Sequence, residues 1–154
     1  MITTVRTATR ADAGHLVDWN AAMALETEDK VLDRAVLARG VAGVFDDPRR
    51  GFYLVAERDA SAVGSLLVTF EWSDWRCGDW WWIQSVYVPP PARRLGVFRA
   101  LYDDVERRAR ATPGVVGLRL YVEAGNKKAQ QTYENLGMST SSYRFFARGF
   151  LDET

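Results

Sequence analysis

One stretch of the sequence, Val86–Phe98, combines residue types that suit the binding of an anionic group. It starts as an apolar segment typical of a buried strand, passes through a rigid run of prolines, and continues as a basic loop with Gly96 before a helix. A helix that begins directly after a strand leaves its first backbone amides without intrahelical partners, at the positive end of the helix dipole. The stretch therefore predicts a site for a phosphate or pyrophosphate.

The composition argues against several other kinds of function. Lys and Arg number 20 and so do Asp and Glu, so no basic excess indicates a nucleic-acid partner. Cys77 and His15 are the only residues of their types, which speaks against a disulfide, a metal site or a Cys–His dyad. No apolar run approaches the roughly 18 residues of a membrane span, and no signal layout is present. We therefore expect a cytoplasmic protein with no membrane partner.

Alternating strands and helices must position the predicted anion site. Residues 80–88 read Trp-Trp-Trp-Ile-Gln-Ser-Val-Tyr-Val, which is typical of a central strand covered on both faces. A strand, a helix and a further strand in this order predict two parallel strands joined by a crossover. We expect a single domain over residues 1–154. The predicted strands are 5–10, 51–57, 63–72, 80–88, 115–122 and 141–148, and the predicted helices are 12–24, 32–45, 97–111 and 127–136.

Two motifs resemble those of the GCN5-related N-acetyltransferase (GNAT) family. The loop Arg93-Arg94-Leu95-Gly96-Val97-Phe98 is similar to the family's Gln/Arg-x-x-Gly-x-Gly/Ala pattern. Asn126, Ala129, Tyr133 and Leu136-Gly137-Met138 match Asn-x-x-Ala-x-x-x-Tyr-x-x-Leu-Gly-hydrophobic. The resemblance implies an α/β (α+β) fold with a mixed, mostly antiparallel sheet of about six strands and four flanking helices. Its central pair would be parallel and would splay apart.

The resemblance also implies a site for acetyl-CoA, with CoA as the product. Pyrophosphate would lie on the amides of the loop formed by Arg93, Arg94, Leu95, Gly96, Val97 and Phe98. The backbone of Val86 and Val88 would pair with pantetheine amides, and Asn126 would add a cofactor contact besides capping its helix. Phe98 departs from the family's Gly or Ala, and we expect its side chain to point toward the core.

Transfer of an acetyl group to an amine requires a neutral amine, a polarised thioester carbonyl and a proton donor for the thiolate. Tyr133 is the donor that the resemblance implies, although its spacing alone would also fit a core tyrosine. The base is open, because residues 80–85 hold no ionisable group. Glu71 is the first carboxylate candidate and Asp74 the second, and a water relay through Gln84 and Ser85 is the alternative.

We expect the acceptor pocket to involve the loop between the first two helices, the segment before the central strand, and that strand. Aromatic faces with nearby carboxylates suit an ammonium group, so the expected acceptor is a small molecule that carries an amine. The predicted substrate-binding residues are Glu26, Glu28, Trp72, Asp74, Trp82 and Gln84.

Three alternatives remain open from the sequence. The acceptor could be a protein or peptide N-terminus, which would need an open groove. The chain could instead be a catalytically idle acyl-CoA-binding module that regulates a partner. Cys77 could carry the acetyl group, although no base is placed near it. The sequence does not identify the acceptor amine, and it leaves a homodimer open.

Overall fold

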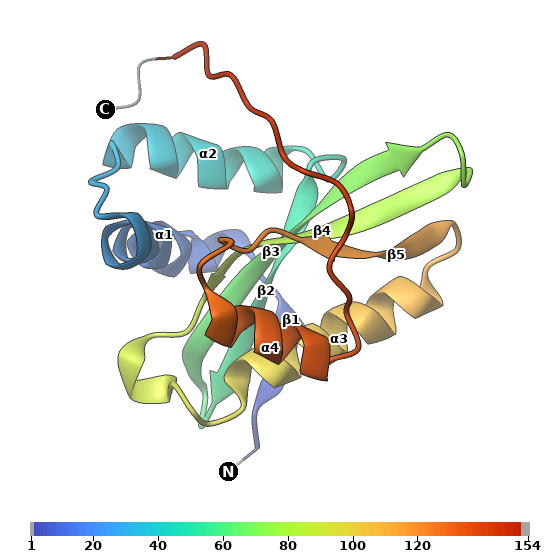
Figure 1. Ribbon diagram of the computed structural model, residues 1–154. Coiled ribbons are helices and arrows are strands. Elements are labelled where there is room, and N and C mark those ends of the chain that lie inside the picture. The colour runs from blue at the N-terminus through green and yellow to red at the C-terminus, as the bar shows by residue number, and fades with distance from the viewer. Residues whose placement is uncertain (1, 152–154) are drawn as a thin grey trace. The chain divides into compact units, whose positions relative to one another are not determined.

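The computed structural model describes residues 2–151 (Figure 1). These residues divide into two compact units at the boundary between Leu120 and Tyr121. The first unit holds a sheet and three helices, and the second holds one helix. The single domain predicted over residues 1–154 stays a prediction.

The first unit is built on a five-stranded mixed sheet with the strand order β1-β2-β3-β4-β5. Neighbouring strands from β1 to β4 are antiparallel, and β4 and β5 are parallel. This confirms the predicted mixed sheet with a parallel pair. The strands are β1 (Thr4–Thr7), β2 (Gly51–Arg58), β3 (Ser61–Ser73), β4 (Gly78–Tyr87) and β5 (Val115–Leu120).

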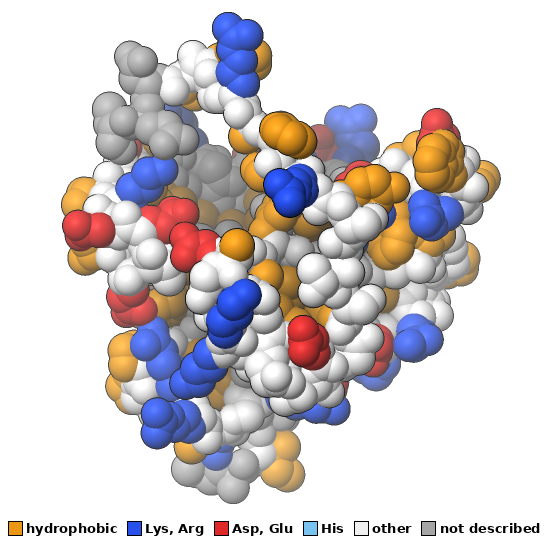
Figure 2. All heavy atoms as spheres, in the orientation of Figure 1, with side chains coloured by type: hydrophobic (Ala, Val, Ile, Leu, Met, Phe, Trp, Pro, Cys, Tyr) orange, Lys and Arg blue, Asp and Glu red, His pale blue; other side chains and the backbone are white. Residues whose placement is uncertain are grey.

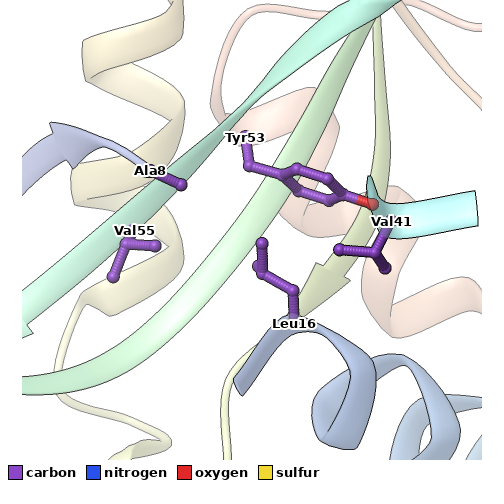
Figure 3. Packing of buried hydrophobic residues seen from close by; sticks show 5 residues of the cluster. All are labelled: Ala8, Leu16, Val41, Tyr53 and Val55. Atoms are coloured by element: carbon purple, nitrogen blue, oxygen red, sulfur yellow. The ribbon is translucent and has the colours of Figure 1, made fainter. Parts of the chain in front are cut away.

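Helices cover both faces of this sheet. On one face, Leu16 of α1 (Ala13–Glu28) and Val41 of α2 (Arg34–Asp46) pack with Tyr53 and Val55 of β2 (Figure 3). Because side chains alternate along a strand, Phe52 and Leu54 point to the opposite face. Helix α3 (Val97–Ala111) contacts β1, β2, β3 and β5 there, with a fully buried stripe that includes Leu101 and Val105. These two apolar layers supply the core.

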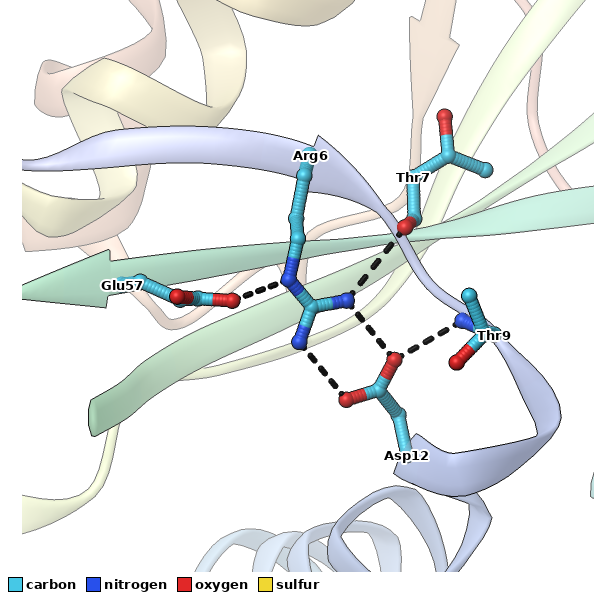
Figure 4. Close-up of polar contacts among 5 residues, drawn as sticks. All are labelled: Arg6, Thr7, Thr9, Asp12 and Glu57. Carbon is cyan, nitrogen blue, oxygen red and sulfur yellow. Dashed lines mark hydrogen bonds and ion pairs between the residues drawn. The ribbon is translucent and has the colours of Figure 1, made fainter. Parts of the chain in front are cut away.

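A polar cluster fixes the entry into α1 (Figure 4). Asp12 is only 6% exposed and accepts hydrogen bonds from Arg6 Nη1 at 2.8 Å and Nη2 at 2.9 Å. It also accepts the backbone amide of Thr9 at 2.8 Å, as in a capping box at the start of a helix. Arg6 is in turn paired with Glu57 of β2. The Arg6 guanidinium lowers the pKa of Asp12, so this carboxyl stays ionised.

The parallel pair separates before β4 ends. The pairs run from Asp79–Val115 to Ile83–Leu120, and β4 then continues to Tyr87 without a partner in β5. An irregularity against β3 lies in the same segment, where Ser85 has φ +51°. The end of β4 therefore has backbone groups that no neighbouring parallel strand pairs, as the predicted splaying requires.

Two sequence predictions about secondary structure are wrong. The predicted closing strand 141–148 is absent: the last regular element is α4 (Lys127–Asn135), so the sheet has five strands. Apolar alternation is not sufficient for a strand, since the ladder also needs a partner, and no described residue pairs with this segment. Glu26 and Glu28 lie in the last turn of α1 rather than in a loop, because helix α1 continues past Ala24 to Glu28.

The surface mixes both signs of charge with scattered apolar side chains, and Figure 2 shows this for one face. Trp72 and Trp75, at the turn between β3 and β4, are 62% and 85% exposed. Across residues 2–151, no helix combines the length and apolar character needed to span a membrane. The same residues contain no group of three His, Cys, Asp or Glu side chains that could hold a metal ion.

Candidate cofactor and acceptor site

The predicted anion-binding stretch forms an exposed loop between β4 and α3. The prolines lead into a short 3-10 turn (Pro90–Ala92), after which residues 93–96 are exposed up to the start of the helix. Gly96 is the N-cap residue, with φ +75°, and it has no side chain that could cap the helix. The amides of the first turn of α3 therefore point out of the helix without an intrahelical acceptor. This is the geometry that binds an anion through backbone groups.

Close packing behind this loop depends on a glycine in β3. A Cβ added at Gly64 would lie 2.8 Å from Cγ1 of Val97 and 3.2 Å from the carbonyl oxygen of Tyr87. The missing side chain lets the end of β4 and the first residue of α3 approach β3. Gly64 thus allows the start of α3 to pack closely against β3.

Three side chains from distant parts of the first unit meet at the loop, and we call Glu26, Tyr87 and Arg93 the loop cluster. Glu26 Oε1 accepts the Tyr87 hydroxyl at 2.9 Å, and Oε2 pairs with Arg93 Nη2 at 2.7 Å. Arg93 Nε donates to the carbonyl oxygen of Val88 at 2.8 Å. The guanidinium also lies 5.7 Å from the centroid of the Tyr87 ring. The cluster joins α1, the end of β4 and the loop.

The electrostatics of the loop cluster favour its charged form. Hydrogen bonds from Arg93 and then from Tyr87 lower the pKa of Glu26. Burial, followed by the bond to Glu26, raises the pKa of Tyr87, so its phenol keeps its proton. The cluster is therefore an ionised carboxylate held between a guanidinium and a neutral hydroxyl at neutral pH.

Phe98 follows the prediction only in part. Its side chain is half-buried, with its ring centroid 6.3 Å from that of Tyr102. Val97, only 2% exposed, takes the fully buried position at the start of the core stripe. Phe98 therefore packs along the helix and does not enter the centre of the core.

A second cluster lies on the sheet face that also carries Tyr53, and we call Glu71, Trp82 and Arg119 the sheet cluster. Glu71 Oε1 accepts Trp82 Nε1 at 2.8 Å, and Oε2 pairs with Arg119 Nη1 at 2.9 Å. The Arg119 guanidinium lies 3.9 Å from the ring centroid of Trp80. That ring lies on Gly117, where an added Cβ would come within 2.5 Å of it. Glu71 as the general base stays a prediction.

The predicted acceptor residues fall into separate places. Gln84 lies beside the sheet cluster and donates to the hydroxyl of Thr69, whereas Glu26 belongs to the loop cluster. Trp72 follows Glu71 in β3, so alternation turns its side chain to the opposite face. Asp74 lies in the turn and accepts the amide of Trp75 at 2.9 Å. Glu28 is exposed at the end of α1. The structure therefore gathers Glu71, Trp82 and Gln84 and leaves the other predicted residues apart from them.

The second unit carries the other motif. Asn126 Oδ1 accepts the amide of Ala129 at 3.1 Å, so Asn126 caps α4 as its position predicts. Gly137 has φ +93°, and the Met138 amide donates to the carbonyl of Tyr133 at 3.1 Å, which closes the helix as expected. Tyr133 is half-buried, and burial raises the pKa of its phenol. Its predicted role, like the predicted cofactor contact of Asn126, stays a prediction.

Sequence reasoning missed two residues of these clusters. Tyr87 occurs in an apolar strand, where a tyrosine is expected simply to pack. Arg119 is a lone charge among apolar residues of β5, and that was the available signal. The sequence could not predict that Arg119 pairs with Glu71. The two residues are 48 positions apart, and they meet only because of the register of three strands.

Comparison with known proteins gives one consistent result. Residues 15–138 match the model of the acetyltransferase (GNAT) family. The crystal structure of a possible acetyltransferase from Clostridium difficile 630 is 37% identical, with a TM-score of 0.91 over 99% of this chain and 100% of that one. No curated protein matches the chain.

Two structures of lower identity share the fold. A predicted acetyltransferase with acetyl-CoA from Clostridium acetobutylicum is 15% identical, with a TM-score of 0.78 over 96% of both chains. Glucosamine-6-phosphate N-acetyltransferase from Arabidopsis thaliana is 17% identical, with a TM-score of 0.73 over 97% of this chain and 99% of that one.

Proposed function

Because the chain belongs to the GNAT acetyltransferase family, we propose that it transfers the acetyl group of acetyl-CoA to the amine of a small molecule. One observation carries the cofactor part of the proposal. The start of α3 presents uncapped amides at the end of the loop that follows β4, and the parallel partner of β4 pairs with it only as far as Ile83. The amides suit a pyrophosphate, and the unpaired strand edge suits a chain of amides.

The residues at this place fit the cofactor in two ways. Backbone amides at the start of α3, from Gly96 to Phe98, would hold the pyrophosphate without needing a side chain. The backbone of Val86 and the amide of Val88 would pair with pantetheine, while the Val88 carbonyl already accepts Arg93. Bound there, acetyl-CoA would supply an activated acetyl thioester.

The chain's own residues would then move protons. The acceptor amine must reach the carbonyl carbon in its neutral form, and the departing thiolate takes a proton. Tyr133 donates that proton in our proposal, since the burial that raises its pKa keeps the phenol protonated at neutral pH. Proton removal from the amine is assigned to Glu71 or to a water relay beside Gln84, and kinetics of Glu71→Gln separates the two.

The proposed acceptor site is the sheet face around Trp82. Its aromatic rings, the Glu71 carboxylate and the Gln84 amide offer both cation–π and hydrogen-bonding partners to a small amine. Glu71 and Arg119 are 44% and 29% exposed, so solvent and a ligand can reach both. This accessibility lets an acceptor amine reach the sheet cluster from solvent.

Turnover of acetyl-CoA with a panel of small amines tests the proposal through release of the CoA thiol. Tyr133→Phe should lower kcat by about 10²-fold or more and leave the dissociation constant of CoA unchanged. Tyr143→Phe is the matched control, because Tyr143 is 76% exposed, and its kcat should equal that of the wild type. Binding of CoA without any thiol release would instead favour a non-catalytic module. Absence of CoA binding would refute the proposal.

A further inference from the structure

Two consecutive arginines of the β4–α3 loop are held very differently. Arg93 donates from Nη2 to Glu26 and from Nε to the Val88 carbonyl, and its guanidinium lies 5.7 Å from the centroid of the Tyr87 ring. Arg94 is exposed and, within residues 2–151, makes no hydrogen bond or ion pair. Arg94 also has φ +63°, a left-handed conformation that costs a non-glycine residue free energy and is typical of functional loops.

The contacts of Arg93 support the backbone of the loop. Its guanidinium ties the end of β4 at Val88 to the last turn of α1 at Glu26, whose other oxygen is held by the buried Tyr87. Tyr87 is 7% exposed, and its ring lies 6.3 Å from that of Trp19 in α1. If the Arg93 guanidinium moved away, the Glu26 carboxylate would lose its ion pair and the Val88 carbonyl would lose its hydrogen bond from Arg93. A phosphate that bound through Nε or Nη2 of Arg93 would have to break one of these two contacts.

We infer that Glu26 and Tyr87 set the affinity for CoA without touching it, by holding Arg93 as a support of the loop backbone, while Arg94 is the cation that meets the phosphates. The inference rests on the proposed function and changes the predicted roles of two residues. Glu26 is a positioning residue and not a contact for the acceptor amine. Arg93, predicted to touch pyrophosphate, acts through the Val88 carbonyl instead.

Calorimetric titration with CoA at low and high salt tests this division, with acceptor kinetics at saturating acetyl-CoA. Glu26→Gln should raise the Kd of CoA by about five- to tenfold, with the same salt dependence as the wild type and an unchanged acceptor KM. Tyr87→Phe should weaken CoA in the same way and by less. Arg94→Gln should raise the Kd at low salt and flatten its salt dependence, because a direct contact to phosphate is lost.

Asp18→Asn is the matched control. Asp18 is an exposed carboxylate of the same helix, paired with Arg34 instead of with the loop, so its removal should leave the Kd of CoA unchanged. A double-mutant cycle adds a second measurement: Glu26→Gln should have little further effect in an Arg93→Gln background. Thermal melting of each variant identifies any that fail to fold, and the milder Tyr87→Phe then carries the comparison.

Three results would overturn the inference. An acceptor KM that rises in Glu26→Gln with an unchanged Kd of CoA would make Glu26 an acceptor contact. Tighter CoA binding in Glu26→Gln, together with a flattened salt dependence in Arg93→Gln, would make Arg93 the phosphate ligand. A wild-type protein that does not bind CoA refutes the proposed function as well, whereas the first two results leave it intact.

Discussion

The loop cluster and the sheet cluster are built from the same parts. Each has a glutamate with one oxygen bound to an aromatic donor, the Tyr87 hydroxyl or the Trp82 indole, and the other bound to an arginine. In each, that arginine also lies over an aromatic ring. Both arrangements give each oxygen of a partly exposed carboxylate a hydrogen-bond donor.

What differs is the part of the fold that each cluster connects. The sheet cluster bridges β3, β4 and β5, which backbone hydrogen bonds already hold in register. The loop cluster bridges α1, the end of β4 and a loop that has no ladder of its own, and its arginine binds a backbone carbonyl. The same chemistry therefore adds little order to the sheet and fixes much of the conformation of the loop.

The largest expected effect comes from filling the space behind the loop. Gly64→Ala places a Cβ against the branched Val97 side chain and near the Tyr87 carbonyl, so β4 or α3 must shift. We expect a loss of about 1–3 kcal/mol in the free energy of unfolding and weaker CoA binding, measured by urea denaturation and calorimetry.

Gly117→Ala is the counterpart at the sheet cluster. The three atoms nearest to its Cβ would all belong to the side chain of Trp80 and none to the backbone, so we expect a smaller loss of stability and an unchanged Kd of CoA. A larger effect on CoA in Gly117→Ala than in Gly64→Ala would contradict the contrast between the two clusters.

Removal of the sheet arginine should have the next largest effect. Arg119→Ala leaves Glu71 with Trp82 alone and uncovers Trp80, so we expect a loss of about 1 kcal/mol, since both partners are partly exposed. Tryptophan fluorescence should change and the acceptor KM should rise, without a change in the Kd of CoA. Arg119→Lys keeps the charge but not the planar stacking, and it should recover only part of the loss. A full recovery by lysine would show that stacking is unimportant.

The smallest expected effect is on the loss of stability at acidic pH. It concerns two carboxylates, the exposed Glu26 and the buried Asp12. The pKa of each is lowered in the folded protein by an arginine. Their stabilising contribution is therefore present above the ordinary pKa of the carboxyl, near 4, and is lost as the pH falls through the lowered value.

Asp12→Asn should consequently lower stability at pH 7 and flatten the decline of unfolding free energy between about pH 5 and pH 2. Glu26→Gln should flatten it less, because Glu26 is exposed and its interaction is screened by solvent. Denaturant unfolding at a series of pH values measures both, and an equal effect of the two changes would argue against this ranking.

Much of the fold could be predicted because its signals are local. Asn126 caps the helix that follows it, and Gly137 ends the same helix. The unbroken apolar run at 80–88 likewise predicts a strand from neighbouring residues alone. The predicted closing strand failed because strand pairing is not local, and apolar alternation in residues 141–148 says nothing about a partner. The same limit applied to the site: Glu26, Glu71 and Arg93 were named from the sequence, but Arg119 and both carboxylate–arginine pairings were not.

The sequence by itself determined which loop can hold an anion. The first amides of a helix have no intrahelical acceptor, and this does not depend on the packing around the helix. It also determined the second motif, whose asparagine and glycine act on their own helix. Only the tertiary structure decided that Arg93 is occupied and Arg94 is exposed, since Glu26 lies 67 residues away from Arg93. Two adjacent arginines are equivalent in a sequence, and the packing of α1 against β4 makes them different.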